Sequence, residues 1–233
     1  MVAIFFDVDD TLYDQLLPFE RAFKKVFPQL QVDAEDLYKK SRILSDSVFE
    51  LSEAGKISSD DMKVYRIQEA CRQIGIHITR EQAFAFQTTY EVFQKEIALS
   101  DTMKTILDYC KNANAVIGII TNGPSSHQEM KIHQLNLSRW VPANRIIISS
   151  QVGVAKPNMQ IFEIAKRQLD NQEEQILYYI GDNFTNDVKG ADDAGWRTIW
   201  LNKRQHRVNE NLPINSFMVH NEEQLLNHIK RIL

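Results

Sequence analysis

The most informative residues of this sequence are four aspartates that lie just beyond the ends of two apolar runs. Asp7 and Asp9 follow the N-terminal run, and Asp182 follows a later one, with Asp187 five residues further along the chain. Carboxylates that converge on one site repel one another unless a cation lies among them. Oxygen ligands without histidine or cysteine partners favour Mg²⁺, which commonly binds one or two carboxylates, water and a substrate phosphate. The four aspartates therefore predict a magnesium site.

Three further polar residues suit the chemistry of a phosphoryl group. Thr121 and Asn122 follow another apolar run, and Lys156 stands before Pro157 and a predicted helix. A lysine, a hydroxyl and Mg²⁺ around an aspartate offset charge on the equatorial oxygens of a phosphoryl group, while the carboxylate attacks in line. A second carboxylate two residues away can protonate the leaving alkoxide and then activate water. These residue types thus predict phosphoryl chemistry.

The elements that must position these residues are buried strands of a parallel sheet. The apolar runs are continuous rather than alternating, which is typical of strands that are covered on both faces. Helical patterns lie between them and complete an alternating β/α order. In an open parallel sheet, ligands bind beyond the carboxyl ends of the strands, where the polar residues above are placed. The predicted strands are 2–6, 115–120, 145–148, 176–180 and 198–201, and the predicted helices are 101–112, 125–136, 158–169, 185–194 and 221–232.

The segment 14–100 has a different pattern, with no comparable strand. It reads as four helices, and the first strand of the chain is too short to fold without partners from beyond residue 100. We therefore predict a discontinuous α/β domain, 1–13 with 101–233, and a helical domain, 14–100, inserted into it. The four predicted helices are 17–27, 34–53, 59–74 and 80–98.

The composition is that of an ordinary globular protein. The chain has 233 residues, 43% of them hydrophobic, and a net charge of −4 from 27 basic and 31 acidic residues. This balance does not favour a nucleic-acid polymer or an anionic membrane as a partner. Two cysteines, Cys71 and Cys110, cannot form a disulfide framework, and neither a secretory signal nor a membrane span is visible. We expect a cytoplasmic protein with two buried thiols; the oligomeric state is not readable.

The motifs and their order resemble those of the haloacid dehalogenase superfamily of phosphohydrolases. The residues that carry the resemblance are Asp7-Val8-Asp9-Asp10-Thr11 after the first strand, Thr121 after the second, Lys156, and Gly181-Asp182 with Asp187. The resemblance spans nearly the whole chain. It implies an α/β fold with a Rossmann-like parallel sheet core, in which the inserted helices form a cap domain, and it implies Mg²⁺ as the cofactor.

The resemblance also implies catalytic roles for four residues. Asp7 would be the nucleophile that becomes an aspartyl-phosphate, and Asp9 would be the general acid and base. Thr121 would hydrogen-bond the phosphoryl oxygens, and Lys156 would hold the phosphoryl group and orient the nucleophile.

The remaining roles concern the metal and the substrate. Asp182 and Asp187 would bind Mg²⁺ beside the nucleophile, and the backbone carbonyl of Asp9 would complete the protein ligands. Asn122 is a predicted substrate contact. Lys56 is another: it lies in the segment 53–57 between two predicted cap helices, and related caps place such a loop over the active site, where it meets the leaving group. The predicted metal ligands are thus Asp7, Asp9, Asp182 and Asp187, and the predicted substrate contacts are Thr121, Asn122, Lys156 and Lys56.

Within this family the acid at position 9 favours phosphate ester hydrolysis over cleavage of a carbon–halogen bond, which needs no proton for an alkoxide. The motifs Asp-Val-Asp-Asp-Thr-Leu and Thr-Asn-Gly resemble 5′-nucleotidase-like members, so we predict a small phosphorylated metabolite, a nucleoside 5′-monophosphate, as the substrate. Phosphoglycolate or a sugar phosphate, or a phosphomutase reaction, stays open. The alternative from another class is a non-catalytic phospho-acceptor signalling module, although receiver domains are shorter and carry the nucleophile on a later strand.

Other residues are expected to serve the fold. The acidic residues among them are predicted to be structural or solvated, the basic ones to lie in a solvated loop, and the aromatic ones to pack in the core. They are Asp10, Asp192 and Asp193; Lys203, Arg204 and Arg207; and Tyr178, Tyr179, Trp196 and Trp200.

Overall fold

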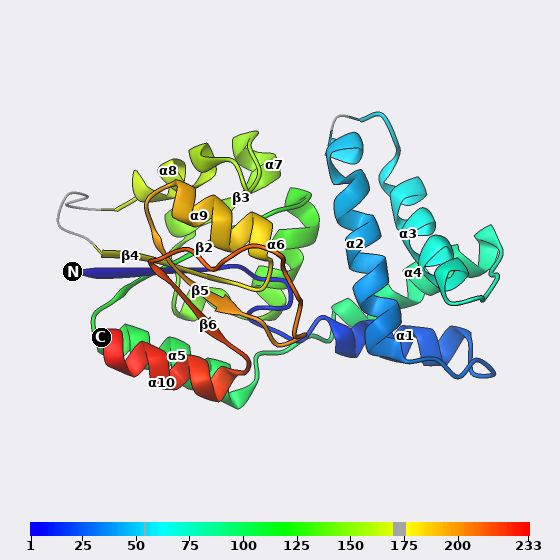
Figure 1. Cartoon of the computed structure of the whole chain (residues 1–233), viewed down its shortest axis with the longest axis horizontal. Helices are drawn as coiled ribbons and strands as arrows, with labels where there is room; N and C mark the ends of the chain where they lie inside the picture. Colours follow the sequence, from blue (N-terminus) through cyan, green and yellow to red (C-terminus); the bar gives the residue numbers. More distant parts are fainter. Residues whose placement is uncertain (54, 170–175) are drawn as a thin grey trace. The chain divides into compact units, whose positions relative to one another are not determined.

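The computed structural model of the chain describes residues 1–53, 55–169 and 176–233. Contacts within it divide the chain into two compact units. The α/β unit comprises Met1–Asp14 and Ala98–Leu233, and the helical unit comprises Gln15–Ile97. The N-terminal strand lies among strands from the second half of the chain (Figure 1). The α/β unit is therefore built from two stretches of sequence.

A six-stranded, fully parallel sheet forms the centre of the α/β unit, in the strand order β3-β2-β1-β4-β5-β6. The predicted α/β class with a parallel sheet is confirmed, and so are the five predicted strands. The sixth strand was not predicted because it lies at the edge of the sheet, where Phe217 and Met218 are exposed and no buried apolar run forms. The strands are β1 Val2–Phe6, β2 Val116–Thr121, β3 Ile146–Ile148, β4 Ile176–Gly181, β5 Arg197–Leu201 and β6 Ser216–Val219.

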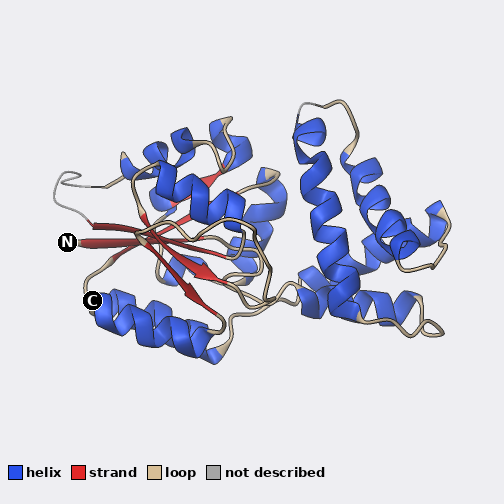
Figure 2. Cartoon of the chain, viewed as in Figure 1, coloured by secondary structure: helices blue, strands red, loops and turns tan. Residues whose placement is uncertain are grey.

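Helices cover both faces of this sheet, which explains the continuous apolar strands (Figure 2). Helices α5 and α10 pack together on one side, and α8 and α9 lie on the other (Figure 1). The predicted helix 185–194 is a π-helical turn, η4, followed by a short α-helix. The helical elements are α5 Asp101–Asn112, α6 Ser125–Gln134, α7 Ser149–Val152, α8 Met159–Lys166, η4 Phe184–Lys189, α9 Gly190–Asp193 and α10 Glu222–Ile232, with 3₁₀ turns at Leu137–Arg139 and Ala143–Arg145.

The register of the central strands brings three chain segments to one edge. Phe6 at the end of β1 lies opposite Ile119 of β2 and Ile180 of β4. The backbone N–H of Asp7 then continues the ladder by donating to the carbonyl of Ile180 at 2.9 Å. Side chains that follow β1, β2 and β4 consequently emerge close together.

The helical unit consists of the four predicted helices around an aromatic core. Phe19 packs edge-to-face against Tyr38, Phe86 and Tyr90, with ring centroids 5.1 to 5.9 Å apart. The predicted helix starts are confirmed: Ser58 accepts a hydrogen bond from the N–H of Asp61, and a capping box begins the last helix. The helices are α1 Leu16–Val26, α2 Ala34–Glu53, α3 Ser59–Gln73 and α4 Arg80–Gln94.

The predictions of two buried thiols and of no membrane span concern the chain as a whole. Both cysteines are buried, Cys71 in α3 of the helical unit and Cys110 in α5 of the α/β unit. Among the described residues, none of the helices combines the length and the apolar character that a membrane span requires.

Candidate active site

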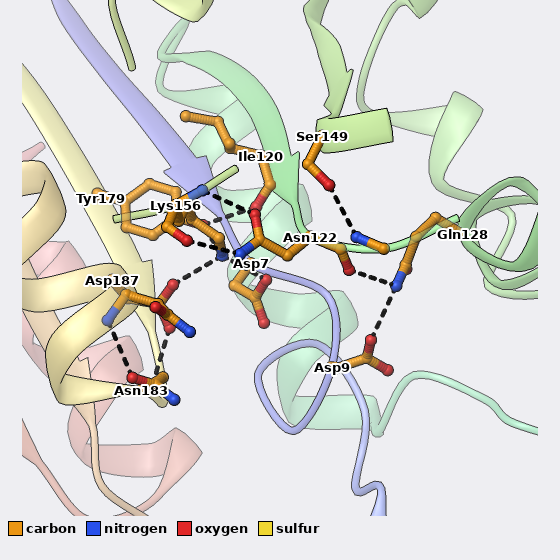
Figure 3. Close-up of polar contacts among 12 residues, drawn as sticks. Asp7, Asp9, Ile120, Asn122, Gln128, Ser149, Lys156, Tyr179, Asn183 and Asp187 are labelled. Carbon is orange, nitrogen blue, oxygen red and sulfur yellow. Dashed lines mark hydrogen bonds and ion pairs between the residues drawn. The ribbon is translucent and has the colours of Figure 1, made fainter. Parts of the chain in front are cut away.

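A lysine and two aspartates from three different segments meet in the interior at the carboxyl edge of the sheet. The ammonium of Lys156 donates to Asp7 Oδ1 and to Asp187 Oδ1, each at 2.7 Å (Figure 3). Its third contact is Tyr179 Oη, also at 2.7 Å. Since the Tyr179 hydroxyl donates to the carbonyl of Ile120 at 2.7 Å, it accepts from the lysine. The three donors of the ammonium therefore have three buried acceptors, which fixes its position.

Burial and like charges control the electrostatics of this cluster. Desolvation raises the pKa of Asp7 to about 7, because burial and the carboxylates of Asp187 and Asp9 outweigh the attraction of Lys156. Burial alone would lower the pKa of Lys156, but Asp187 and Asp7 hold it well above its usual range. The lysine thus stays charged, and the carboxylates around it retain an excess of negative charge.

Asp7 and Asp187, together with Asp182, form a set of ligand atoms suited to a hard cation. One oxygen from each of Asp7, Asp182 and Asp187 lies within 4.8 Å of the others. All three donors are carboxylate oxygens, and a bound cation would offset the repulsion between their negative charges. This donor set fits Mg²⁺.

The sequence around Asp187 explains how its side chain enters the site. A Cβ atom at Gly181 would lie 2.2 Å from Asp187 Oδ2, so only glycine leaves room for this carboxylate. Asn183 begins the π-helical turn η4: its side chain accepts from the N–H of Asn186, and its own N–H donates to Asp187 Oδ2 at 2.9 Å. Short π-helical segments of this kind are often found at functional sites. Asn183 therefore orients Asp187.

Asn122 connects the end of β2 to the loop that carries Lys156. Its Nδ2 donates to the carbonyl of Lys156, and the N–H of Lys156 donates to Asn122 Oδ1, both at 2.9 Å (Figure 3). The structure thus places the Asn122 amide on the backbone of the lysine loop. Its predicted contact with substrate stays a prediction.

The hydroxyl of Thr121 is a buried polar group at the site for which the described residues offer no hydrogen-bond partner. Thr121 is buried, and no hydrogen bond to its Oγ1 is found among the described residues. A buried hydroxyl left without a partner costs free energy, and such a group is retained where a ligand uses it. Its position fits the predicted contact with phosphoryl oxygens.

Asp9 points away from the Lys156 cluster and toward Gln128 (Figure 3). Lys131 Nζ donates to both of its carboxylate oxygens, at 2.7 and 2.6 Å. Tyr13 Oη donates to Asp9 Oδ1 at 2.5 Å, and Gln128 Nε2 donates to Oδ2 at 3.1 Å. Sequence analysis missed these three partners. The available signal was the spacing of Gln128 and Lys131, which stand three residues apart and so share one face of the helix that follows Thr121.

Gly123 allows this helix to approach the site. Its φ is +137°, a conformation that favours glycine, and a Cβ atom there would lie 2.9 Å from Gln128 Nε2. Gln128 Nε2 also donates to the carbonyl of Asn122 at 2.9 Å. The Thr-Asn-Gly motif therefore supplies a hydroxyl, a tie to the lysine loop, and space for Gln128.

The prediction of a solvated basic loop is wrong for Arg204. This residue is only 9% exposed, and its Nε and Nη2 donate to the two carboxylate oxygens of Asp10 at 3.1 and 3.0 Å. It also pairs with Asp14. Local composition could not reveal these contacts, because the acids are distant in sequence. Asp10 is structural, as predicted.

The tyrosine at position 179 was predicted to serve the core alone. Its ring does pack there, edge-to-face against Phe162, but its hydroxyl binds Lys156 as described above. Burial and neighbouring acids hold the pKa of Tyr179 well above its usual range, so it acts as a neutral phenol.

Lys56 is the one predicted site residue that belongs to the helical unit. It lies in the turn between α2 and α3, where it is exposed and its N–H donates to the carbonyl of Leu51 at 2.9 Å. Ala54 of the same predicted loop lies outside the described residues. The contact of Lys56 with substrate stays a prediction.

Comparison with known proteins gives a consistent result. The family model of haloacid dehalogenase-like hydrolases matches residues 4–201. The chain is 27% identical over 211 residues to the pyrimidine 5′-nucleotidase YjjG of Escherichia coli, which covers 90% of this chain and 89% of that protein. It is 28% identical over 207 residues to a glyceraldehyde 3-phosphate phosphatase of Methanothermobacter thermautotrophicus, covering 86% of this chain and 85% of that protein.

A solved structure shares the fold. The magnesium-bound HAD-hydrolase YfnB of Bacillus subtilis aligns with a TM-score of 0.71 at 21% identity, covering 98% of both chains. The family match extends over most of the chain and includes each of the motifs that follow β1, β2 and β4. The chain therefore belongs to the haloacid dehalogenase-like hydrolase family and is an enzyme of that family.

Proposed function

We propose that the protein is a Mg²⁺-dependent phosphatase that hydrolyses a small phosphate monoester through an aspartyl-phosphate on Asp7. The observation that carries this proposal is the buried cluster in which Lys156 contacts Asp7 and Asp187 at 2.7 Å. In this cluster the proposed nucleophile lies beside a buried ammonium and beside carboxylates suited to a metal, which supports the proposal. A signalling module of the receiver type is disfavoured, because the chain aligns with hydrolases over most of its length.

The positions of the side chains support the following chemistry. Asp7 attacks phosphorus, while Lys156 and the hydroxyl of Thr121 bind the phosphoryl oxygens. Asp9 gives a proton to the departing alkoxide and then takes one from the water that hydrolyses the aspartyl-phosphate. Bound Mg²⁺, held by Asp7, Asp182, Asp187 and the carbonyl of Asp9, would supply positive charge that offsets the charge on the phosphoryl group.

For the leaving group we propose a nucleoside 5′-monophosphate. The similarity to a pyrimidine 5′-nucleotidase over 90% of the chain supports this choice. A three-carbon sugar phosphate is the second candidate, because the glyceraldehyde 3-phosphate phosphatases match over a comparable length. We assign the helical unit the role of the cap domain of this family, which excludes water during chemistry.

The test is a panel of phosphate esters assayed for phosphate release with and without Mg²⁺. The panel contains pyrimidine and purine 5′-monophosphates, glyceraldehyde 3-phosphate, phosphoglycolate and hexose phosphates. We expect Mg²⁺-dependent hydrolysis with highest kcat/KM on a nucleoside monophosphate. Asp7→Asn should abolish it, whereas the matched control Asp193→Asn, at an exposed aspartate, should not.

Two results would contradict this proposal. The first is the absence of hydrolysis of every ester in the presence of Mg²⁺. The second is near-normal activity of the Asp7→Asn variant.

A further inference from the structure

We propose that Lys131 is a positioning residue that fixes the orientation of the Asp9 carboxylate, the group that exchanges a proton with the leaving group in the proposed mechanism. Its role depends on the proposed phosphatase function, in which Asp9 is the acid. Lys131 is not one of the residues through which the proposed mechanism binds the phosphoryl group.

The geometry that supports this role is a pair of hydrogen bonds from Lys131, one to each carboxylate oxygen of Asp9. One ammonium donates to Asp9 Oδ1 at 2.7 Å and to Oδ2 at 2.6 Å, which fixes the plane of the carboxyl group as well as its distance. Tyr13 and Gln128 add one donor to each oxygen. A carboxylate held by one oxygen can rotate about its last bond, and this one is held against such rotation.

The burial of Lys131 shows that the contact is specific. Lysines on amphipathic helices usually extend their ammonium into water. The side chain of Lys131 is instead 2% exposed, and that of its partner Asp9 is 16% exposed. Taking an ammonium out of water costs several kcal/mol unless a partner compensates it. The contact with Asp9 therefore does not arise by chance on a solvated surface.

A chain of hydrogen bonds joins this pair to the nucleophile. Gln128 donates both to Asp9 and to the carbonyl of Asn122, and Asn122 binds the backbone of Lys156, whose ammonium binds Asp7 (Figure 3). Each of the two catalytic carboxylates thus has its own buried lysine. Lys156 serves the nucleophile, and Lys131 serves the acid.

The consequence can be measured through the leaving group. An alkoxide needs a proton as it departs, whereas 4-nitrophenolate leaves without one, so only the first depends on a correctly oriented Asp9. The parameter kcat/KM covers the steps up to departure of the leaving group and excludes hydrolysis of the intermediate. The ratio of kcat/KM for a nucleoside 5′-monophosphate to kcat/KM for 4-nitrophenyl phosphate therefore reports the orientation of Asp9.

The experiment compares this ratio in the wild type, Lys131→Met, Lys131→Arg and Asp9→Asn. Because both substrates are assayed on one preparation, any inactive fraction cancels. General acid catalysis contributes about 100- to 10,000-fold, so we expect Asp9→Asn to lower the ratio by at least about 100-fold and Lys131→Met by about 10- to 100-fold. Lys131→Arg, whose guanidinium can bind both oxygens, should keep the ratio within about threefold of the wild type.

The possible outcomes distinguish a failure of the inference about Lys131 from a failure of the proposed phosphatase function. An unchanged ratio in Lys131→Met, with both substrates slowed equally, would show a merely structural role and overturn the inference. A wild type that hydrolyses neither substrate would instead contradict the proposed function. An unchanged ratio in Asp9→Asn would remove the acid role on which Lys131 depends. If Lys131→Met does not fold, Lys131→Gln replaces it, because its amide can hold one oxygen and should lower the ratio by a smaller factor.

Discussion

The two units of the chain differ in whether they bury charged side chains. Among the residues that the structure describes, six charged side chains are buried in the α/β unit, whereas every buried polar side chain of the helical unit is an uncharged serine or glutamine. Burial lowers the pKa of Arg66 in the helical unit, but the residue as a whole is only partly buried, and its guanidinium donates to Gln87 at 2.9 Å. The six buried charges of the α/β unit are Asp7, Asp10, Lys131, Lys156, Asp187 and Arg204.

This difference supports our proposal that the α/β unit carries the chemistry. Burying an ion costs several kcal/mol, and the cost is offset only by close partners of opposite charge. The α/β unit bears it at three places at one edge of its sheet: around Lys156, around Lys131 and around Arg204. The helical unit relies on aromatic packing and keeps its ion pairs in solvent. Substitutions of the buried charges in the α/β unit should therefore reduce both activity and stability, whereas substitutions in the aromatic core of the helical unit should reduce the stability of that unit.

The largest effect is expected for Lys156→Met. Removing the ammonium leaves Asp7 and Asp187 buried without their cation, which should lower the free energy of unfolding without Mg²⁺ by about 3–5 kcal/mol. Loss of this charge from the phosphoryl site should also reduce kcat by about 100-fold or more. Urea unfolding and phosphate release measure the two effects. A variant with normal activity and stability would show that the cluster is not the functional centre.

Phe19→Ala in the helical unit should lower the free energy of unfolding by a similar amount, through loss of aromatic packing rather than loss of a buried charge. Truncating this ring removes the centre of the aromatic core and should cost about 3–5 kcal/mol. The two buried thiols report the units separately, because burial raises the pKa of Cys71 to about 11 and that of Cys110 to about 12. Below those values each thiol stays protonated and poorly reactive until its unit opens.

Iodoacetamide labelling at pH 8, read by peptide mass spectrometry, is the measurement. Phe19→Ala should speed labelling of Cys71 in the helical unit and leave Cys110 in the α/β unit protected. Equal acceleration at both thiols would show that the two units unfold together, and would remove the distinction drawn between them.

A smaller effect is expected from Mg²⁺, and it should be confined to the α/β unit. A ligand present at 100 times its Kd stabilises a folded protein by about 2.7 kcal/mol. Mg²⁺ should therefore raise the melting temperature and slow the labelling of Cys110 more than that of Cys71. Asp182→Asn should abolish the shift. An identical shift in that variant would remove Asp182 from the metal ligands.

The smallest effect is expected for Lys24→Met. Its ammonium pairs with Glu20 at 2.5 Å on the surface of α1, and the lysine side chain is largely exposed. Exposed pairs of this type contribute about 0.3–0.5 kcal/mol, so the urea midpoint should hardly move. A loss comparable to that of Lys156→Met would contradict the contrast between buried and exposed charge.

Much of the fold follows from local patterns, and the site follows only in part. The five buried strands and the helix starts at Ser58 and Thr79 are readable because apolar runs and caps act over a few residues. Strand β6 lacks such a run. At the site, the carboxylates that follow β1 and β4 were predictable from the strand ends. Lys131 and Arg204 were not, because each is defined by a partner about 120 or more residues away.

Tyr179 shows that a sequence pattern can predict the burial of a side chain without predicting its polar contacts. Its ring obeys the core pattern that predicts burial, but the position of its hydroxyl depends on the register of β4 against β1 and on the loop that holds Lys156. Side chains that serve both packing and chemistry carry no separate sequence signal.

The most direct test of the central claim is to trap the phosphoryl group on Asp7. Asp9→Asn would be mixed with 4-nitrophenyl phosphate and Mg²⁺, because this substrate needs no acid to leave while the altered base slows hydrolysis of the intermediate. Acid quench and mass spectrometry of the N-terminal tryptic peptide, which ends at Arg21, should show one added phosphoryl group located at Asp7. Turnover without any phosphorylated Asp7, or a phosphoryl group located on another residue, would contradict the account.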